Sequence, residues 1–387
     1  MRILHIDTER GWRGGERQAL WLAAELARRE HVSIVAARPG EPLAQRAPAQ
    51  GIELLPCAPA FEADPRGVLA LRRYLRARSI EVVHAHTAHA AGLGALATLG
   101  MDVPLVVARR VDFRLRRNVG TRWKYGRAAA VIAVSRAVAE VLAQGGVARD
   151  KIVVVPDGTD VHRRIVAASP ETLASLGLRS GAPLAVQVAQ LVPHKDPLNF
   201  VHAVATARTR VATLQALLVG EGPLRADVER AVRDLGLADT LYLAGYRDDA
   251  DEMIAAADVA VLSSREEGLG SVLLDALLLG KPVAATRAGG IPDVVEHGVT
   301  GLLAPVSDPQ ALGDHIAALL TDRALAGRLG AAARSRVAEF SVERMTDRTL
   351  AVYERVLARN SPDGRDDTKR RTDAATRTRS ASSTRAS

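Results

Sequence analysis

The chain has few cysteines, few aromatic side chains and no long uncharged run among its 387 residues. Its one cysteine, Cys57, excludes an intramolecular disulfide framework and suits a reducing compartment. Aromatic residues make up 3% of the chain, so it lacks the stacking platforms of nucleic-acid binders, and we expect no nucleic-acid partner. No apolar run approaches the ~20 residues that span a bilayer, and residues 1–6 predict a strand rather than a signal peptide. We therefore expect a cytoplasmic protein.

The charge that is present is unevenly distributed. Residues 1–165 hold 26 Lys and Arg against 16 Asp and Glu, whereas residues 166–360 hold 19 against 24. The basic excess is densest in one cluster, which consists of Arg109, Arg110, Arg114, Arg116, Arg117, Arg122, Lys124 and Arg127. This basic cluster is expected to attract an anionic partner such as a membrane surface, which would make the protein peripheral on the inner face of the membrane. A solvated helix face gives the same pattern.

Short apolar runs alternate with helical segments along most of the chain. Strands are expected at 2–6, 32–37, 80–84, 104–108, 130–134 and 152–155, and then at 184–189, 214–219, 240–244, 258–262, 282–286 and 301–304. Segments with helical periodicity lie between them. The alternation predicts an α/β protein with two doubly wound, Rossmann-like domains of parallel strands. The carboxyl ends of both sheets should face a central cleft, where ligands bind in such folds.

Composition also predicts the limits of these domains. Turn residues between 156 and 183 interrupt the alternation, so we place an N-terminal domain at 1–165 and a C-terminal domain at 166–340. Residues 361–387 consist largely of Arg, Ser, Thr, Asp and Ala, with almost no apolar residue, which predicts a disordered tail.

The segment richest in chemical features runs from residue 263 to residue 276. It follows an apolar strand, turns at two glycines and enters a helical pattern. A strand, a glycine-bearing turn and a helix start present free backbone N–H groups to an anion. Two acids, Glu267 and Asp275, lie about two helical turns apart, or ~12 Å along a helix axis. This arrangement can hold a phosphate between two carboxylates that accept hydroxyl hydrogen bonds, which indicates a phosphorylated sugar.

Three other loops should face the same cleft. Gly14 and Gly15 precede a helix, Lys195 follows the first strand of the second half, and Gly220 begins a Gly-Glu-Gly-Pro turn. Glycine lets the backbone approach a ligand closely, and lysine neutralises a diphosphate as a point charge. Each signal alone is equally typical of an ordinary turn or a solvated lysine. None is a Gly-x-Gly-x-x-Gly or Walker A loop, so neither dinucleotide binding nor ATP hydrolysis is supported.

In their order along the chain these segments resemble the GT-B glycosyltransferases of family GT4, retaining enzymes with nucleotide-sugar donors. Glu267 and Asp275 match the two acids of the family's E-x7-E motif, with aspartate as the second acid. Lys195 matches the lysine of its G-R-L…K segment, in which Gln190 replaces the usual arginine. The further matches are residues 14–15, 156–160, 220–224, 289–295 and 298–303. The resemblance covers about residues 1–357.

The resemblance implies that the C-terminal domain binds the nucleotide sugar and the N-terminal domain the acceptor, with a helix at 341–358 crossing back to the first domain. The implied catalytic residues are Glu267, which would contact hydroxyls of the transferred sugar, and Lys195, which would stabilise the diphosphate leaving group. Asp275 would accept hydrogen bonds from the ribose, and Arg247 would lie in the base-contacting loop. The implied donor-binding residues are Gly14, Gly15, Gln190, Lys195, Gly220, Arg247, Glu267, Gly270, Ser271, Val272 and Asp275.

For the acceptor the candidates are His86, Arg109 and Arg110. Many relatives carry a histidine after the strand that here ends at Ala108, where this chain has two arginines that would suit an acidic acceptor. His86 could line the cleft, but a histidine at a strand end is also typical of a structural residue. The resemblance implies no cofactor and no metal ion, because Lys195 and the helix start supply positive charge, and the sequence shows no cluster of metal ligands.

The implied activity is a retaining, metal-independent transfer of a sugar from a nucleoside-diphosphate sugar to a hydroxyl group. Retention would come from front-face attack by the acceptor. The basic first domain favours a lipid-linked or cell-envelope saccharide as acceptor, and a soluble small molecule is the alternative. Gln190 and Asp275 leave open a non-catalytic GT-B protein that binds nucleotide sugars or regulates a partner. A phosphorylase is disfavoured because it needs a cofactor-bearing lysine and a longer chain.

Overall fold

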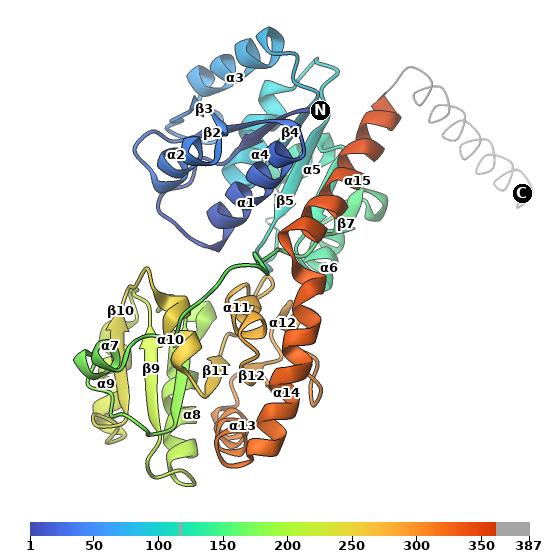
Figure 1. Ribbon diagram of the computed structural model, residues 1–387. Helices are drawn as coiled ribbons and strands as arrows, with labels where there is room; N and C mark the ends of the chain where they lie inside the picture. The colour runs from blue at the N-terminus through green and yellow to red at the C-terminus, as the bar shows by residue number, and fades with distance from the viewer. Residues whose placement is uncertain (116–117, 361–387) are drawn as a thin grey trace, which may run out of the picture.

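The computed structural model describes residues 1–115 and 118–360, which form two lobes joined by two crossings of the chain (Figure 1). Each lobe is a layered α/β domain built on one parallel sheet, which confirms the predicted fold class. The tail predicted at 361–387, and Arg116 and Arg117 of the basic cluster, lie outside the described residues.

The first lobe contains a seven-stranded sheet in the order β3-β2-β1-β4-β5-β6-β7. Its strands are β1 (Arg2–Ile6), β2 (Val32–Ala37), β3 (Glu53–Pro56), β4 (Val82–Ala85), β5 (Leu105–Arg109), β6 (Ala130–Ala133) and β7 (Ile152–Val154). Its helices are α1 (Gly14–Arg28), α2 (Pro42–Arg46), α3 (Pro65–Ala77), α4 (Ala88–Ala97), α5 (Val119–Arg127) and α6 (Arg136–Gln144). The sequence did not predict β3, because this short edge strand ends in proline and has no buried residue.

The second lobe contains a six-stranded sheet in the order β10-β9-β8-β11-β12-β13. Its strands are β8 (Leu184–Val188), β9 (Gln215–Val219), β10 (Leu241–Gly245), β11 (Val259–Leu262), β12 (Val283–Thr286) and β13 (Leu302–Ala304). Its helices are α7 (Pro170–Ser175), α8 (Pro197–Arg208), α9 (Arg225–Asp234), α10 (Ala250–Ala256), α11 (Val272–Leu278), α12 (Ile291–Val294), α13 (Pro309–Thr321) and α14 (Arg323–Arg336). Strand order reverses beside β8, so the turns after β8 and β11 flank the switch point at which ligands bind.

The last helix, α15 (Val342–Asn360), returns to the first lobe and runs beside its sheet (Figure 1). Its buried residues recur at helical spacing, among them Met345, Val352, Tyr353 and Val356, and they pack with α1 in one core cluster. Burying an apolar side chain of this size stabilises a fold by about 1.5–3 kcal/mol, so α15 is an integral part of the first lobe.

The two crossings between the lobes are hydrogen-bonded to each other. The N–H of Thr159 donates to the carbonyl of Phe340 at 2.8 Å, and the N–H of Val342 donates to the carbonyl of Thr159 at 3.1 Å. Gly158 makes this approach possible, since a Cβ there would lie 2.9 Å from the Cα of Val342. The lobes are thus joined by two chain segments that pack closely against each other. Within residues 1–115 and 118–360, no helix combines the length and apolar content that a bilayer span requires.

Candidate active site

The turns after β8 and β11 bring together the two residues predicted to be catalytic. Lys195 ends the short helix η3 (Pro193–Lys195), and Glu267 lies in the turn that follows β11. The ammonium of Lys195 and the carboxylate of Glu267 form an ion pair, and Ser264 Oγ donates a further hydrogen bond of 3.0 Å to the same carboxylate. The Lys195 side chain is 22% exposed, so a bound anion can still reach its charge.

Backbone donors lie beside this pair. Within the described residues, the N–H groups of Gly270, Ser271 and Val272 make no hydrogen bond, because they precede or begin α11. Gly270 has a φ of +83°, a left-handed conformation that glycine adopts without strain. Lys195, from the turn after β8, and the three free N–H groups at the start of α11 can together bind a diphosphate.

Asp275, the second acid of the motif, is 4% exposed and lies in α11. Arg163 donates to its Oδ1 at 2.9 Å, and Arg17 of α1 lies 3.6 Å from its Oδ2. Burial raises the pKa of Asp275, and the charges of Arg17 and Arg163 oppose that rise. The acid therefore links α11 to the first lobe and to the crossing between the lobes. Its contact with a ribose stays a prediction.

The other predicted donor-binding residues of the second lobe have ordinary local partners or none. Gln190 is exposed after β8. Gly220 has a φ of +142°, and a Cβ there would lie 2.0 Å from the carbonyl of Ala189, so glycine is required by the packing of two turns alone. Arg247 donates to both oxygens of Asp249, at 2.7 and 2.6 Å. Their contacts with a donor stay predictions.

The first lobe reaches across to the Glu267 turn. Asp112, after β5, accepts a hydrogen bond of 2.7 Å from the N–H of Glu267. A Cβ on Gly268 would lie 1.8 Å from the carbonyl of Arg110, and one on Gly14 would lie 3.0 Å from Ser271 Oγ. The predicted glycine loop at 14–15 therefore does face the start of α11. Sequence reasoning missed Asp112, although its place after a sheet strand was a signal.

The candidates for the acceptor all have partners inside the protein. Arg109 is 8% exposed, and its guanidinium donates to the carbonyl of Phe113 and to Tyr125 Oη. Arg110 donates to Asp157 Oδ1 at 2.9 Å and to His86 Nδ1 at 3.3 Å. Their role toward an acceptor stays a prediction.

Some members of the basic cluster also have partners inside the protein. Lys124 pairs with Glu62 at 2.6 Å, Arg109 is buried, and Arg110 pairs with Asp157. Of the described members, Arg114, Arg122 and Arg127 are exposed. Among the described members, these three are therefore the ones that an anionic surface partner could contact.

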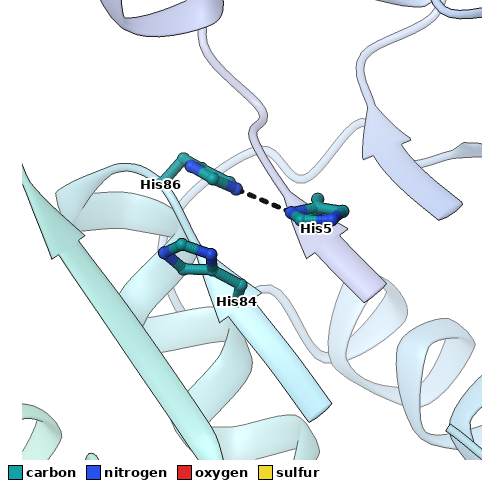
Figure 2. A group of neighbouring side chains, drawn as sticks. All are labelled: His5, His84 and His86. Carbon is teal, nitrogen blue, oxygen red and sulfur yellow. Dashed lines mark hydrogen bonds between the residues drawn. The ribbon is translucent and has the colours of Figure 1, made fainter. Parts of the chain in front are cut away.

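Three buried histidines form a group that the sequence does not reveal, because His5 is far from the other two along the chain (Figure 2). His5 of β1 lies opposite His84 of the parallel strand β4, and His86 follows on the same face. One ring nitrogen from each lies within 4.8 Å of the others, a spacing from which a metal ion could be held. His84 Nδ1 also lies 2.7 Å from Tyr353 Oη.

Arg110 determines where the protons of this histidine group lie. A guanidinium only donates, so His86 Nδ1 accepts, and the neutral ring carries its proton on Nε2. That proton is donated to His5 Nδ1 at 3.0 Å. Burial lowers the pKa of all three histidines, and that of His5 to about 3, so the rings are neutral. A metal ion would compete with this proton and with the charge of Arg110, so the contacts favour a hydrogen-bonded chain.

Two facing Rossmann-like lobes with a lysine–glutamate pair at the switch point define a GT-B type of enzyme, and the comparisons agree. Glycosyl transferases group 1 match residues 169–336, and Glycosyltransferase Family 4 matches residues 12–163. The 2-deoxystreptamine glucosyltransferase of Streptomyces kanamyceticus is 33% identical, over 67% of this chain and 69% of that protein. The chain therefore belongs to this glycosyltransferase family and is a glycosyltransferase.

Other relatives match more partially or in fold alone. The lipopolysaccharide core biosynthesis glycosyltransferase LpsE of Rhizobium meliloti is 31% identical over 46% of this chain. The match covers 51% of that protein. The crystal structure of Anabaena HepE in complex with UDP-glucose superposes with a TM-score of 0.78 at 24% identity, over 91% of this chain and 99% of that one.

Proposed function

We propose that this glycosyltransferase transfers a sugar, with retention and without a metal ion, from a nucleoside-diphosphate sugar to a hydroxyl group. The observation that carries the proposal is the ion pair between Lys195 and Glu267 beside the free N–H groups of residues 270–272. The adjacent turns after β8 and β11 bring together a cation, backbone donors for phosphate and a carboxylate for sugar hydroxyls.

The chemistry follows from that placement. Negative charge develops on the diphosphate as its bond to the anomeric carbon breaks, and Lys195 and the N–H groups stabilise that charge where it forms. Glu267 accepts hydrogen bonds from hydroxyls of the sugar and holds it over the turn. Before the donor binds, the ion pair with Lys195 and the hydrogen bond from Ser264 hold the Glu267 carboxylate in place.

Retention requires the acceptor oxygen to attack from the face that the diphosphate leaves. The new bond from the anomeric carbon to the acceptor oxygen forms as the bond to the phosphate oxygen breaks, and that phosphate oxygen takes the acceptor's proton. No protein nucleophile is needed. A metal ion is not needed either, because Lys195 and the start of α11 supply the positive charge.

The relatives suggest which donor and acceptors to test first. UDP-glucose is the first donor, because the HepE structure contains it and the relative from Streptomyces kanamyceticus is named a glucosyltransferase. A lipid-linked or cell-envelope saccharide at the inner face of the membrane is the first acceptor, supported by the name of LpsE and by the exposed Arg114, Arg122 and Arg127. A soluble acceptor such as an aminocyclitol is the second.

The deciding experiment is thermal-shift binding of a panel of UDP-, GDP- and ADP-sugars to the wild-type protein and to Lys195→Ala. We expect one donor class to stabilise the wild type and not the variant. Turnover with that donor is then measured in EDTA, and NMR of the product gives the anomeric configuration. Inversion, or activity that EDTA abolishes, would contradict the proposal. Binding without turnover on any acceptor would favour the non-catalytic alternative.

A further inference from the structure

Asp112 is the residue by which the first lobe holds Glu267. Its Oδ2 accepts the hydrogen bond of 2.7 Å from the backbone N–H of Glu267. The other polar groups of Glu267 are bound within the second lobe. Its carbonyl accepts from the N–H of Gly290 at 2.8 Å, and its carboxylate is bound by Ser264 and Lys195. The orientation of Glu267 therefore depends on both lobes.

The contact is too close for ordinary side chains at the neighbouring positions. A Cβ on Gly289 would lie 2.6 Å from Asp112 Oδ2 and 2.0 Å from the carbonyl of Glu267. A Cβ on Gly268 would lie 1.8 Å from the carbonyl of Arg110. Two glycines thus make room for one turn of the first lobe to reach the Glu267 turn.

The same turn of the first lobe also touches the loop of Lys195. The ring of Phe113 meets the ring of His194 edge to face, with 5.2 Å between their centroids. His194 directly precedes Lys195. Residues 112–113 of the first lobe therefore contact both turns of the second lobe that carry the ion pair.

Packing alone does not explain a carboxylate at this position. Burial raises the pKa of Asp112, as do the charges of Glu266 and Glu267, and the hydrogen bond from Glu267 N–H opposes the rise. An acid held against its own desolvation and beside two other acids is costly, and what it gains here is the bond to Glu267.

We infer that Asp112 is a positioning residue that orients Glu267 toward the transferred sugar through the contact between the two lobes. The inference rests on the proposed function and deepens it. In the proposed function Glu267 binds hydroxyls of the sugar, whereas Lys195 and the start of α11 bind the diphosphate. Asp112 should therefore control the affinity that the sugar adds to a nucleoside diphosphate, and leave the affinity for the nucleoside diphosphate itself unchanged.

The test is titration calorimetry of the full chain with UDP-glucose, GDP-mannose and ADP-glucose, each beside its own nucleoside diphosphate. The quantity compared is the Kd of the nucleoside diphosphate divided by the Kd of the nucleotide sugar, for the donor that the wild type selects. A lower ratio means that the sugar adds less affinity. Asp112→Ala should lower this ratio about tenfold and leave the Kd of the nucleoside diphosphate within about twofold. Asp112→Asn keeps an acceptor oxygen and should keep the wild-type ratio within about twofold.

Two controls separate positioning from general effects. Glu267→Ala should abolish the sugar's contribution altogether. Arg136→Ala removes the side-chain part of another contact between the lobes, the 2.7 Å bond from the guanidinium to Asp293, without touching Glu267. The backbone N–H of Arg136 keeps its own bond to Asp293, and the ratio should stay unchanged. A wild-type ratio in Asp112→Ala, or an equal loss in Arg136→Ala, would overturn the inference and leave the proposed function intact.

A wild-type protein that binds none of these compounds would overturn the proposed function and the inference together. If Asp112→Ala does not fold, Asp112→Glu decides, because it keeps the charge but lengthens the side chain by one methylene. A lowered ratio in Asp112→Glu supports positioning, and an unchanged ratio overturns it.

Discussion

Arg163 donates a hydrogen bond to Asp275 at 2.9 Å, and this bond ties the second acid of the motif to the crossing between the two lobes. Arg163 also lies 3.1 Å from Asp251, and Arg17 reaches the other oxygen of Asp275 from the first lobe. The aspartate is thus the centre of an ion-pair network at the junction of the lobes. A glutamate, one methylene longer, would have to place its carboxylate elsewhere.

The charge of Asp275 should be held at a cost to the folded state. Burial raises the pKa of this acid, although Arg17 and Arg163 oppose the rise, so the folded state favours the neutral form. We therefore expect Asp275→Asn to equal the wild type near pH 4 and to be at least as stable at about pH 8. Denaturant unfolding at both pH values measures the difference, with Asp251→Asn as the control that loses the more exposed acid of the network. A variant that is clearly less stable than the wild type at about pH 8 would show that the ion pairs outweigh the cost of burial.

Lys195→Ala should lower kcat/KM by about 100- to 1000-fold, since it removes a charge aimed at the leaving group. Lys195→Arg should recover part of this loss, because it keeps the charge. Steady-state kinetics with the donor chosen by the binding panel measure the effect. Lys281→Ala is the matched control, since Lys281 lies after α11 and has no part in the ion pair. A loss of the same size in Lys281→Ala would show that the effect is not specific to Lys195.

Asp7 should make the protein less stable as the pH rises. Burial, and then the charge of Glu16, raise its pKa to about 7, and its Oδ2 has no partner among the described residues. The folded state therefore binds this proton more tightly than the unfolded state, so the stabilisation is complete below about pH 4 and is lost as the pH rises toward 7.

The test compares Asp7→Asn with the wild type. The variant keeps an oxygen for the N–H of Glu9 and should equal the wild type near pH 4. At pH 8 it should be more stable by at most ~4 kcal/mol, from about 1.4 kcal/mol per pH unit. Denaturant unfolding at several pH values measures the difference. Parallel curves for the two proteins would contradict the raised pKa.

The histidine group should make the protein less stable as the pH falls. Burial lowers the pKa of His5, His84 and His86 below the unfolded value of about 6.5. Their contribution to stability is therefore complete above pH 6.5 and is lost as the pH falls below it. Each ring contributes at most about 1.4 kcal/mol per pH unit to this loss in the free energy of unfolding. The free energy of unfolding, measured between pH 5 and 7, should depend less steeply on pH in His5→Gln than in the wild type. Equal slopes would contradict the lowered pKa of His5.

The sequence alone predicts the parts of the site that depend on chain order. Lys195 and Glu267 follow strands of recognisable apolar runs, and parallel strands bring their carboxyl ends to one edge, so the sequence predicts that both lie at one cleft. Their ion pair was not predicted, because it depends on β8 lying next to β11 in the sheet. Asp112 and Arg17 could not be predicted as partners of Glu267 and Asp275, because those contacts depend on how two domains dock. The same reason hides the histidine group, since the strand of His5 must first pair with β4.

Gly268 tests how closely the lobes must approach for the site to form. Its φ is not left-handed, so Gly268→Ala introduces no backbone strain, and its effect comes from a Cβ placed 1.8 Å from the carbonyl of Arg110. That carbonyl belongs to the backbone and cannot rotate away, so the lobes must separate, at a cost of about 1–3 kcal/mol. We expect a larger radius of gyration by small-angle scattering and a loss of the affinity that the sugar adds. Gly327→Ala in α14, where a Cβ meets nothing within 4 Å, should change neither quantity. If Gly268→Ala behaves like Gly327→Ala, the contact between the Arg110–Phe113 turn and the Glu267 turn is not needed for donor binding, and the inference about Asp112 loses its support.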